Sequence, residues 1–199
     1  MFSKSYRPAA ALIAAASIAV ACAACGSTTD STPTGAPASS ATAHIADCVV
    51  KGPGPSSVDD AFTDVSGFTV DHICPGDVDP TLTAKAAEFS AVNTGKVLSD
   101  GKPVLSVFAG QLKGDGGDAF VRTFLEEMGT RVAPKTLATE SKDVGGYHVT
   151  YFNIPSDTEG YAYFEGPTVV IAYDLAGSEN ADAAEKALTA ILAKVYPKP

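Results

Sequence analysis

The chain contains three histidines, His44, His72 and His148, and histidine is the residue that most often acts as a general base near neutral pH. Hydrolysis by a serine or cysteine requires an adjacent base and a third group that orients this base. Ser141, Asp143 and His148 are close in the sequence, but a Gly-Gly turn separates the aspartate from the histidine, and no G-x-S-x-G motif occurs. The sequence therefore predicts a protein that is not an enzyme. A hydrolase that uses His148 and scattered aspartates is the alternative.

Carboxylates gather in three turn-rich segments, and they are the residues that could bind a hard cation. A calcium loop supplies six to eight oxygen ligands, whereas each segment offers only two carboxylates. We therefore expect solvated turns and helix caps here, with no metal and no cofactor. The three pairs are Asp59 and Asp60, Asp77 and Asp79, and Asp115 and Asp118.

Tyrosines concentrate between residues 147 and 173, in segments that alternate like strands. Alternation sends half of such side chains to the core, and those on the other face could form an amphipathic patch. The tentative binding face consists of Tyr147, Tyr151, Tyr161 and Tyr163. The other interpretation is that these are half-buried strand residues with satisfied hydroxyls.

The N-terminus has the pattern of an export signal. Lys4 and Arg7 precede an uncharged run from Ala9 to Ala24. At 1.5 Å per residue this run is too short to span the ~30 Å core of a bilayer comfortably as a permanent helix. We expect residues 1–24 to be a cleaved signal peptide, and a membrane anchor that stays on the mature chain is the alternative.

Two cysteines follow this run, and small residues precede both. The pattern resembles the lipobox of bacterial lipoproteins, in which the chain is cut before a cysteine and its thiol is acylated. Cys25 is followed by the customary Gly26 and Ser27, whereas Cys22 is the alternative lipidation site. Cleavage before Cys25 leaves an even number of other cysteines, which favours Cys25. The resemblance implies a diacylglyceryl anchor in the outer face of the cell membrane. The alternative is that Cys22 and Cys25 are both ordinary small residues of a signal peptide and that neither is acylated.

The two remaining cysteines, Cys48 and Cys74, flank a turn-rich segment. In an exported protein they are expected to form one disulfide, because two thiols without further cysteine or well-spaced histidine ligands cannot build a metal site. The bridge would close a loop of about 26 residues and stabilise the fold by about 3 to 4 kcal/mol.

Composition separates a linker from one domain. Residues 25–43 contain Ser, Thr, Gly, Pro and Ala with one charge, Asp30, and are expected to be a lipidated N-terminus and a disordered linker. Residues 44–199 have the length of a single extracytoplasmic domain. Removal of residues 1–24 leaves 12 basic and 23 acidic residues and a net charge of −11. This charge argues against nucleic acid as a partner.

Hydrophobic periodicity in this domain predicts strands over 86–92 and 103–112, with turns at Asn93-Thr94-Gly95 and Ser99-Asp100-Gly101 between them. A helix is predicted near residues 118–129, with a closing cap at Gly129. It is followed by a strand over 135–142, a strand after Gly145-Gly146, a hairpin that turns at 165–167, and a helix over 180–196. The expected fold is α+β, an antiparallel sheet covered by two helices.

The order of signal peptide, lipobox, Ser/Thr/Pro linker and compact domain is similar to that of actinobacterial lipoproteins of the LpqN type, whose domain has a PsbP-type fold. The resemblance implies a cell-envelope protein that acts by binding. The membrane is its expected partner through the covalent lipid, together with an envelope protein, glycan or lipid. A carrier of a small lipid or glycan is the alternative, and it would need a cavity of several hundred Å³ between helix and sheet.

Mass spectrometry of the membrane-associated mature protein tests the predicted processing. We expect the chain to begin at an acylated Cys25 and to contain Cys48 and Cys74 joined as a disulfide. An intact, unmodified N-terminus would contradict the export and lipidation predictions.

Overall fold

The computed structural model of the protein describes residues 56–175 and 180–197. The predicted signal peptide, the lipidation site at Cys22 or Cys25, the linker and Cys48 lie outside these residues. The bridge between Cys48 and Cys74 therefore stays a prediction.

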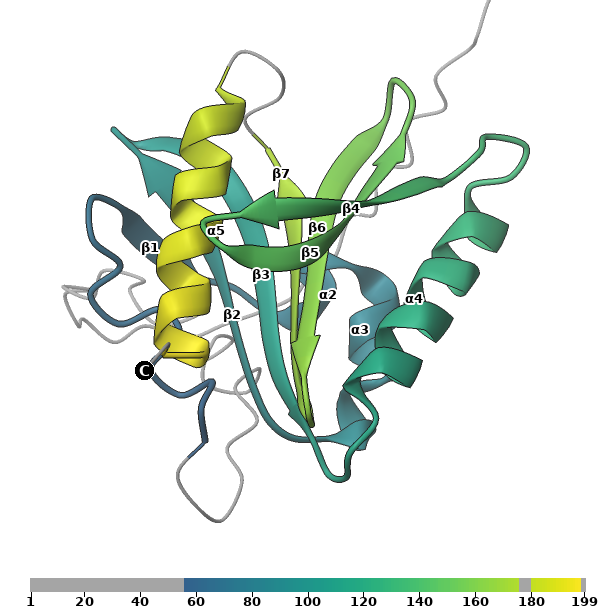
Figure 1. Ribbon diagram of the computed structural model, residues 1–199, viewed down its shortest axis with the longest axis horizontal. Coiled ribbons are helices and arrows are strands. Elements are labelled where there is room, and N and C mark those ends of the chain that lie inside the picture. The colour runs from purple at the N-terminus through teal and green to yellow at the C-terminus, as the bar shows by residue number, and fades with distance from the viewer. Residues whose placement is uncertain (1–55, 176–179, 198–199) are drawn as a thin grey trace, which may run out of the picture. The chain divides into compact units, whose positions relative to one another are not determined.

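A single antiparallel sheet of seven strands organises the domain, in the order β1-β2-β3-β7-β6-β5-β4 (Figure 1). This confirms the predicted α+β fold. The long β2–β3 hairpin and the β6–β7 hairpin form its centre, and the β4–β5 hairpin lies at one edge. The strands are β1 Thr69–His72, β2 Phe89–Ser99, β3 Lys102–Leu112, β4 Ala138–Val144, β5 Tyr147–Ile154, β6 Thr158–Glu165 and β7 Thr168–Asp174.

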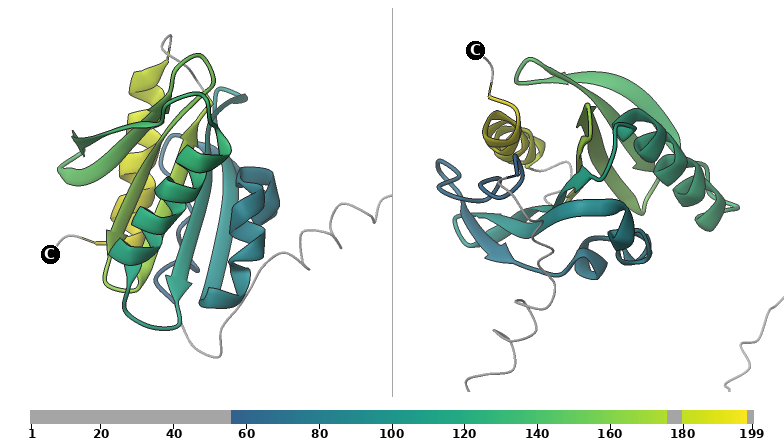
Figure 2. Two further views of the ribbon diagram at one scale, coloured as in Figure 1. Left: turned by 90° about the vertical axis from the view of Figure 1, so that its right-hand side faces the viewer. Right: turned by 90° about the horizontal axis from the view of Figure 1, so that it is seen from below.

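Helices cover both faces of the sheet. The helices α4 (Gly117–Arg131) and α5 (Ala181–Val195) are the long ones, and the short elements α2 (Pro75–Val78), α3 (Pro80–Ala84) and η1 (Ala86–Glu88) precede β2. The sheet curves around α5, while α2, α3 and α4 lie on the opposite face (Figure 2). Each face therefore has its own hydrophobic cluster.

The apolar stripes predicted for the two long helices are confirmed. The residues on the stripe of α5 are all buried against the sheet, and they are Ala184, Leu188, Ile191, Leu192 and Val195. On α4 the buried residues are Phe120, Val121, Phe124 and Met128, and Leu125 is half-buried. The cap predicted at Gly129 is wrong, because α4 continues to Arg131, whose guanidinium binds Asp79.

The turn predicted at Asn93-Thr94-Gly95 is also wrong. Thr94 and Gly95 pair with β3 inside the long strand β2, and strand pairing along the whole hairpin outweighs the local turn signal. Gly95 is needed there because a Cβ atom would lie 2.6 Å from Val70 Cγ1. The second predicted turn is confirmed, with positive φ at both Asp100 and Gly101.

Short elements before β2 were not predicted, since their segment reads as turns. Pro75 and Pro80 each occupy a first helical turn, where proline is favoured. The backbone N–H of Cys74 donates to the Asp77 carboxylate at 2.9 Å, and that of Thr81 donates to Asp79 at 2.9 Å. The expected role of these two aspartates in helix capping is thereby confirmed.

Close packing across β5, β6 and β7 depends on Gly160. Phe152 and Tyr173 are its direct neighbours on the two flanking strands, and their rings pack edge to face with centroids 5.5 Å apart. A Cβ atom at Gly160 would lie 2.5 Å from Phe152 Cζ and 2.3 Å from the carbonyl oxygen of Ala172.

We therefore expect Gly160→Ala to lower the free energy of unfolding by about 1 to 3 kcal/mol, because the added methyl group would clash with Phe152 and with the backbone of β7. Gly114→Ala is the matched control, since no atom lies within 4 Å of its Cβ position and the residue is exposed. Urea denaturation of both variants measures the difference. Equal stabilities would contradict the packing argument.

Candidate functional site

A cavity of about 410 Å³ opens on the α4 face of the sheet. Its floor includes Lys96 on β2, Ser106 on β3 and Tyr173 on β7. Residues of α2 and the last turn of α4 form the walls, and the β5–β6 loop and the end of β7 form the rim. We call it the Ser106 cavity.

Asp79 is the central group of the cavity wall, and it is only 4% exposed. Two guanidinium nitrogens of Arg131 donate to its two oxygens at 2.8 and 2.6 Å. The Tyr173 hydroxyl donates to Oδ2 at 2.5 Å. The backbone N–H and hydroxyl of Thr81 donate to Oδ1 at 2.9 and 2.7 Å. This carboxylate therefore joins α3, the end of α4 and β7.

These contacts fix the charge of each group. Burial alone would raise the pKa of Asp79, but the hydrogen bonds from Arg131, Tyr173 and Thr81 outweigh it and hold the pKa far below its usual range. The hydrogen bond to Asp79 raises the pKa of Arg131. Burial, followed by the contact with Asp79, raises the pKa of Tyr173. Near neutral pH the network therefore anchors the fold and does not exchange protons.

Ser106 lies beside this network and is 5% exposed. Among residues 56–175 and 180–197 its hydroxyl has no hydrogen-bond partner, and it is the one buried side-chain polar atom there in this condition. A buried hydroxyl left without a partner costs about 1 to 3 kcal/mol. A hydroxyl in this position can donate a hydrogen bond to, or accept one from, a polar group that enters the cavity.

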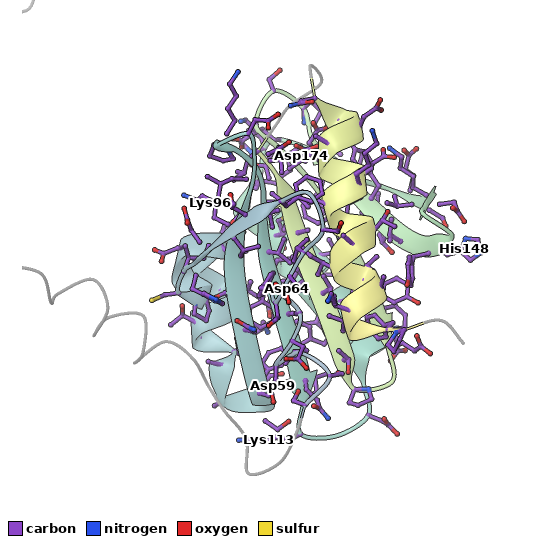
Figure 3. All side chains as sticks on the ribbon, turned by 90° about the vertical axis from the view of Figure 1, so that its left-hand side faces the viewer. Asp59, Asp64, Lys96, Lys113, His148 and Asp174 are labelled. Carbon is purple, nitrogen blue, oxygen red and sulfur yellow. The ribbon has the colours of Figure 1, made fainter. Side chains whose placement is uncertain are left out.

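Ser106 has Lys96 of β2 as its direct neighbour on one side and Tyr173 of β7 on the other. On its own other side, Lys96 pairs with Asp71 of β1. In the part of the chain that the structure describes, Lys96 makes no salt bridge. Figure 3 shows it on the side of α2 and α3, away from α5, at the same end of the sheet as Asp174. The floor thus presents an unpaired ammonium beside an unpaired hydroxyl.

The predicted tyrosine face lies on the other side of the sheet, with α5. Tyr147 and Tyr161 are buried there, and Tyr151 and Tyr163 are half-buried. The hydroxyl of Tyr147 donates to the carbonyl oxygen of Tyr196 at 3.1 Å. Only Tyr151 and Tyr163 leave part of the ring accessible, so the accessible surface of this face is small.

Asp143 and His148 come together on β4 and β5, as their places in the sequence allow. The distance from Nδ1 to Oδ2 is 3.4 Å, and the histidine side chain is 84% exposed. Figure 3 shows His148 pointing away from the domain. Ser141 pairs with Thr150 across the same two strands, and no hydrogen bond among the described residues joins it to His148. This geometry is that of a surface contact between an exposed imidazole and a carboxylate.

The pairs Asp59 and Asp60, and Asp115 and Asp118, remain in separate exposed segments. Within the described ranges no group of three or more histidine, cysteine or acidic side chains is placed to hold a metal ion. No helix in these ranges is both long and apolar enough to cross a bilayer.

A second depression of about 580 Å³ runs between α4 and the strands β4 to β6. Leu125, Leu137 and Phe164 contribute its apolar side chains. Phe164 is 41% exposed, which is unusual for a large apolar residue in this domain. We call this depression the Phe164 groove.

Sequence reasoning found Asp79 as a cap but missed Lys96, Ser106, Arg131 and Tyr173 as its neighbours. Arg131 lies 52 residues and Tyr173 lies 94 residues from Asp79, and no local pattern links them. Comparisons of the chain with protein-family models, with curated proteins and with solved structures gave no match.

The Asp79 network makes stability depend on pH. Because the pKa of Asp79 is depressed in the folded state, its stabilisation is present above the unfolded-state pKa of about 4 and is lost as the pH falls further. Asp79→Asn should lower the free energy of unfolding at pH 7 by about 3 kcal/mol, the lower end for breaking a buried pair. The lower end applies because the Arg131 side chain is 40% exposed.

The difference between wild type and Asp79→Asn should shrink below about pH 4, where the wild type loses this contribution. Asp157→Asn is the matched control, since it removes an exposed ion pair with Lys135 and should cost at most about 1 kcal/mol. Denaturant titrations between pH 3 and 7 measure both. A constant difference across this range would contradict the role of Asp79.

Proposed function

We propose that this chain is an exported, lipid-anchored protein of the cell envelope, and that its domain binds a small polar ligand in the Ser106 cavity. The signal-like N-terminus and the lipobox-like cysteines support the export and the anchor. The unpartnered hydroxyl of Ser106, buried at the floor of the cavity, carries the proposal for binding.

The size of the cavity also supports a ligand-binding role. Small-molecule sites typically have volumes of about 300 to 1,000 Å³ and contain a few converging polar groups. The Ser106 cavity has about 410 Å³ and lies between helices and the sheet, where a carrier would hold its ligand. Lys96, Ser106 and Tyr173 lie side by side on the paired strands β2, β3 and β7, an arrangement that would hold the groups of a binding site in fixed positions.

Binding is favoured over catalysis by the charge states in the cavity. Asp79 is held ionised and Tyr173 protonated near neutral pH, so neither is poised as a general acid or base. The hydrolase alternative would have to use His148, whose side chain is exposed at the β4–β5 edge, apart from the cavity.

Native mass spectrometry of the full-length protein, released from its membrane in detergent, tests the proposal. We expect the wild type to carry a small molecule that Ser106→Leu loses, because the leucine fills the floor of the cavity. Phe164→Ser is the control, since it alters the Phe164 groove and should keep the ligand. Circular dichroism verifies that each variant is folded.

Two results would overturn the proposal. One is a wild-type protein that carries no small molecule. The other is a ligand that survives in folded Ser106→Leu and disappears in Phe164→Ser, which would assign binding to the apolar groove.

A further inference from the structure

We infer that the ligand of the Ser106 cavity is a small zwitterion, such as a free α-amino acid or a dipeptide, and that Lys96 and Ser106 bind its carboxylate. This inference rests on the proposed function and specifies its ligand class.

The first step concerns the floor of the cavity. Lys96 and Ser106 are direct neighbours on paired strands, and both line the cavity. The serine hydroxyl is unpartnered and the ammonium makes no salt bridge within the described ranges. A carboxylate accepts hydrogen bonds at two oxygens, so it can satisfy an ammonium and a hydroxyl at once. The other cation in the lining, Arg131, is already held by Asp79.

The second step concerns the remaining charges. Four carboxylates line the cavity against two cations, and they belong to Asp77, Asp79, Asp157 and Asp174. Carboxylates thus outnumber cations in the lining, and acidic side chains surround the Lys96 ammonium. A ligand with anionic charge alone would be repelled there. A ligand that also carries an ammonium group is attracted by the same carboxylates.

The third step concerns size and stability. A cavity of about 410 Å³ has room for an amino acid or a dipeptide. Ser106 on the central strand β3 makes no hydrogen bond that would stabilise the fold, so a function in binding accounts for the buried hydroxyl. Its removal should therefore weaken binding without lowering the melting temperature.

Isothermal titration calorimetry of the full-length protein in detergent provides the test. The probes are the twenty L-α-amino acids and a set of dipeptides, followed by the N-acetyl and C-terminal amide forms of the best binder. We expect the amide to bind at least tenfold more weakly than the free acid, and the N-acetyl form to bind several-fold more weakly. Lys96→Met should weaken binding of the free acid at least tenfold and leave that of the amide nearly unchanged.

Two matched controls separate recognition from stability. Lys102→Met removes an exposed lysine of β3 that does not line the cavity, and it should leave the affinity unchanged. Ser90→Ala removes a hydroxyl that donates to the carbonyl oxygen of Gln111 at 3.0 Å, so it should lower the melting temperature without affecting binding. Ser106→Ala should do the reverse, with a several-fold loss of affinity and no loss of thermal stability.

The possible outcomes test the zwitterion inference and the proposed ligand-binding function separately. If amides bind as well as free acids, or if Lys96→Met has no effect, the inference is overturned. If no probe binds while native mass spectrometry finds another molecule that Ser106→Leu loses, the inference fails and the proposed function stands. If neither method finds a ligand in the cavity, both fail.

Discussion

The carboxylate of Asp79 is the contact on which the arrangement of the α4 face depends. It accepts hydrogen bonds from the start of α3, from the last turn of α4 and from β7, three elements that are far apart in the sequence. A buried charge is tolerated only when all its acceptor sites are used, and here they are. Together with the buried apolar stripe of α4, this side chain holds the last turn of α4 in place, and with it one wall of the Ser106 cavity.

The helices cover the two faces of the sheet to different extents. On the α5 face the sheet curves around the helix, and apolar residues from strands at both edges meet its buried stripe. On the other face α4 and the short helices do not meet completely, and a polar cavity remains between them. Both faces contribute a buried apolar cluster, and the incompletely covered face is the one on which we propose that a ligand binds.

Local patterns were sufficient for α4, α5 and the β6–β7 hairpin, because one helical stripe or one turn defines each of them. They failed at Asn93-Thr94-Gly95, where pairing with β3 decides the structure, and in the segment 69–84, where Asp79 and the prolines build short helices around long-range contacts. The cavity could not be predicted, since Ser106 is an ordinary strand serine until β2, β7 and α4 surround it. What distinguishes Ser106 from other strand serines is that its buried hydroxyl has no hydrogen-bond partner among the described residues, and only the structure shows this.

The place of α5 after all seven strands affects how the domain can fold. Residues 181–195 supply the whole helix that covers the curved face of the sheet, including Leu188 and Ile191. Until the last of them is synthesised, the buried strand residues that pack with α5, such as Val107, lack part of their apolar cover, which α5 shares with the segment 58–65. A chain that lacks this helix would therefore expose apolar residues of the sheet, and such a surface promotes aggregation.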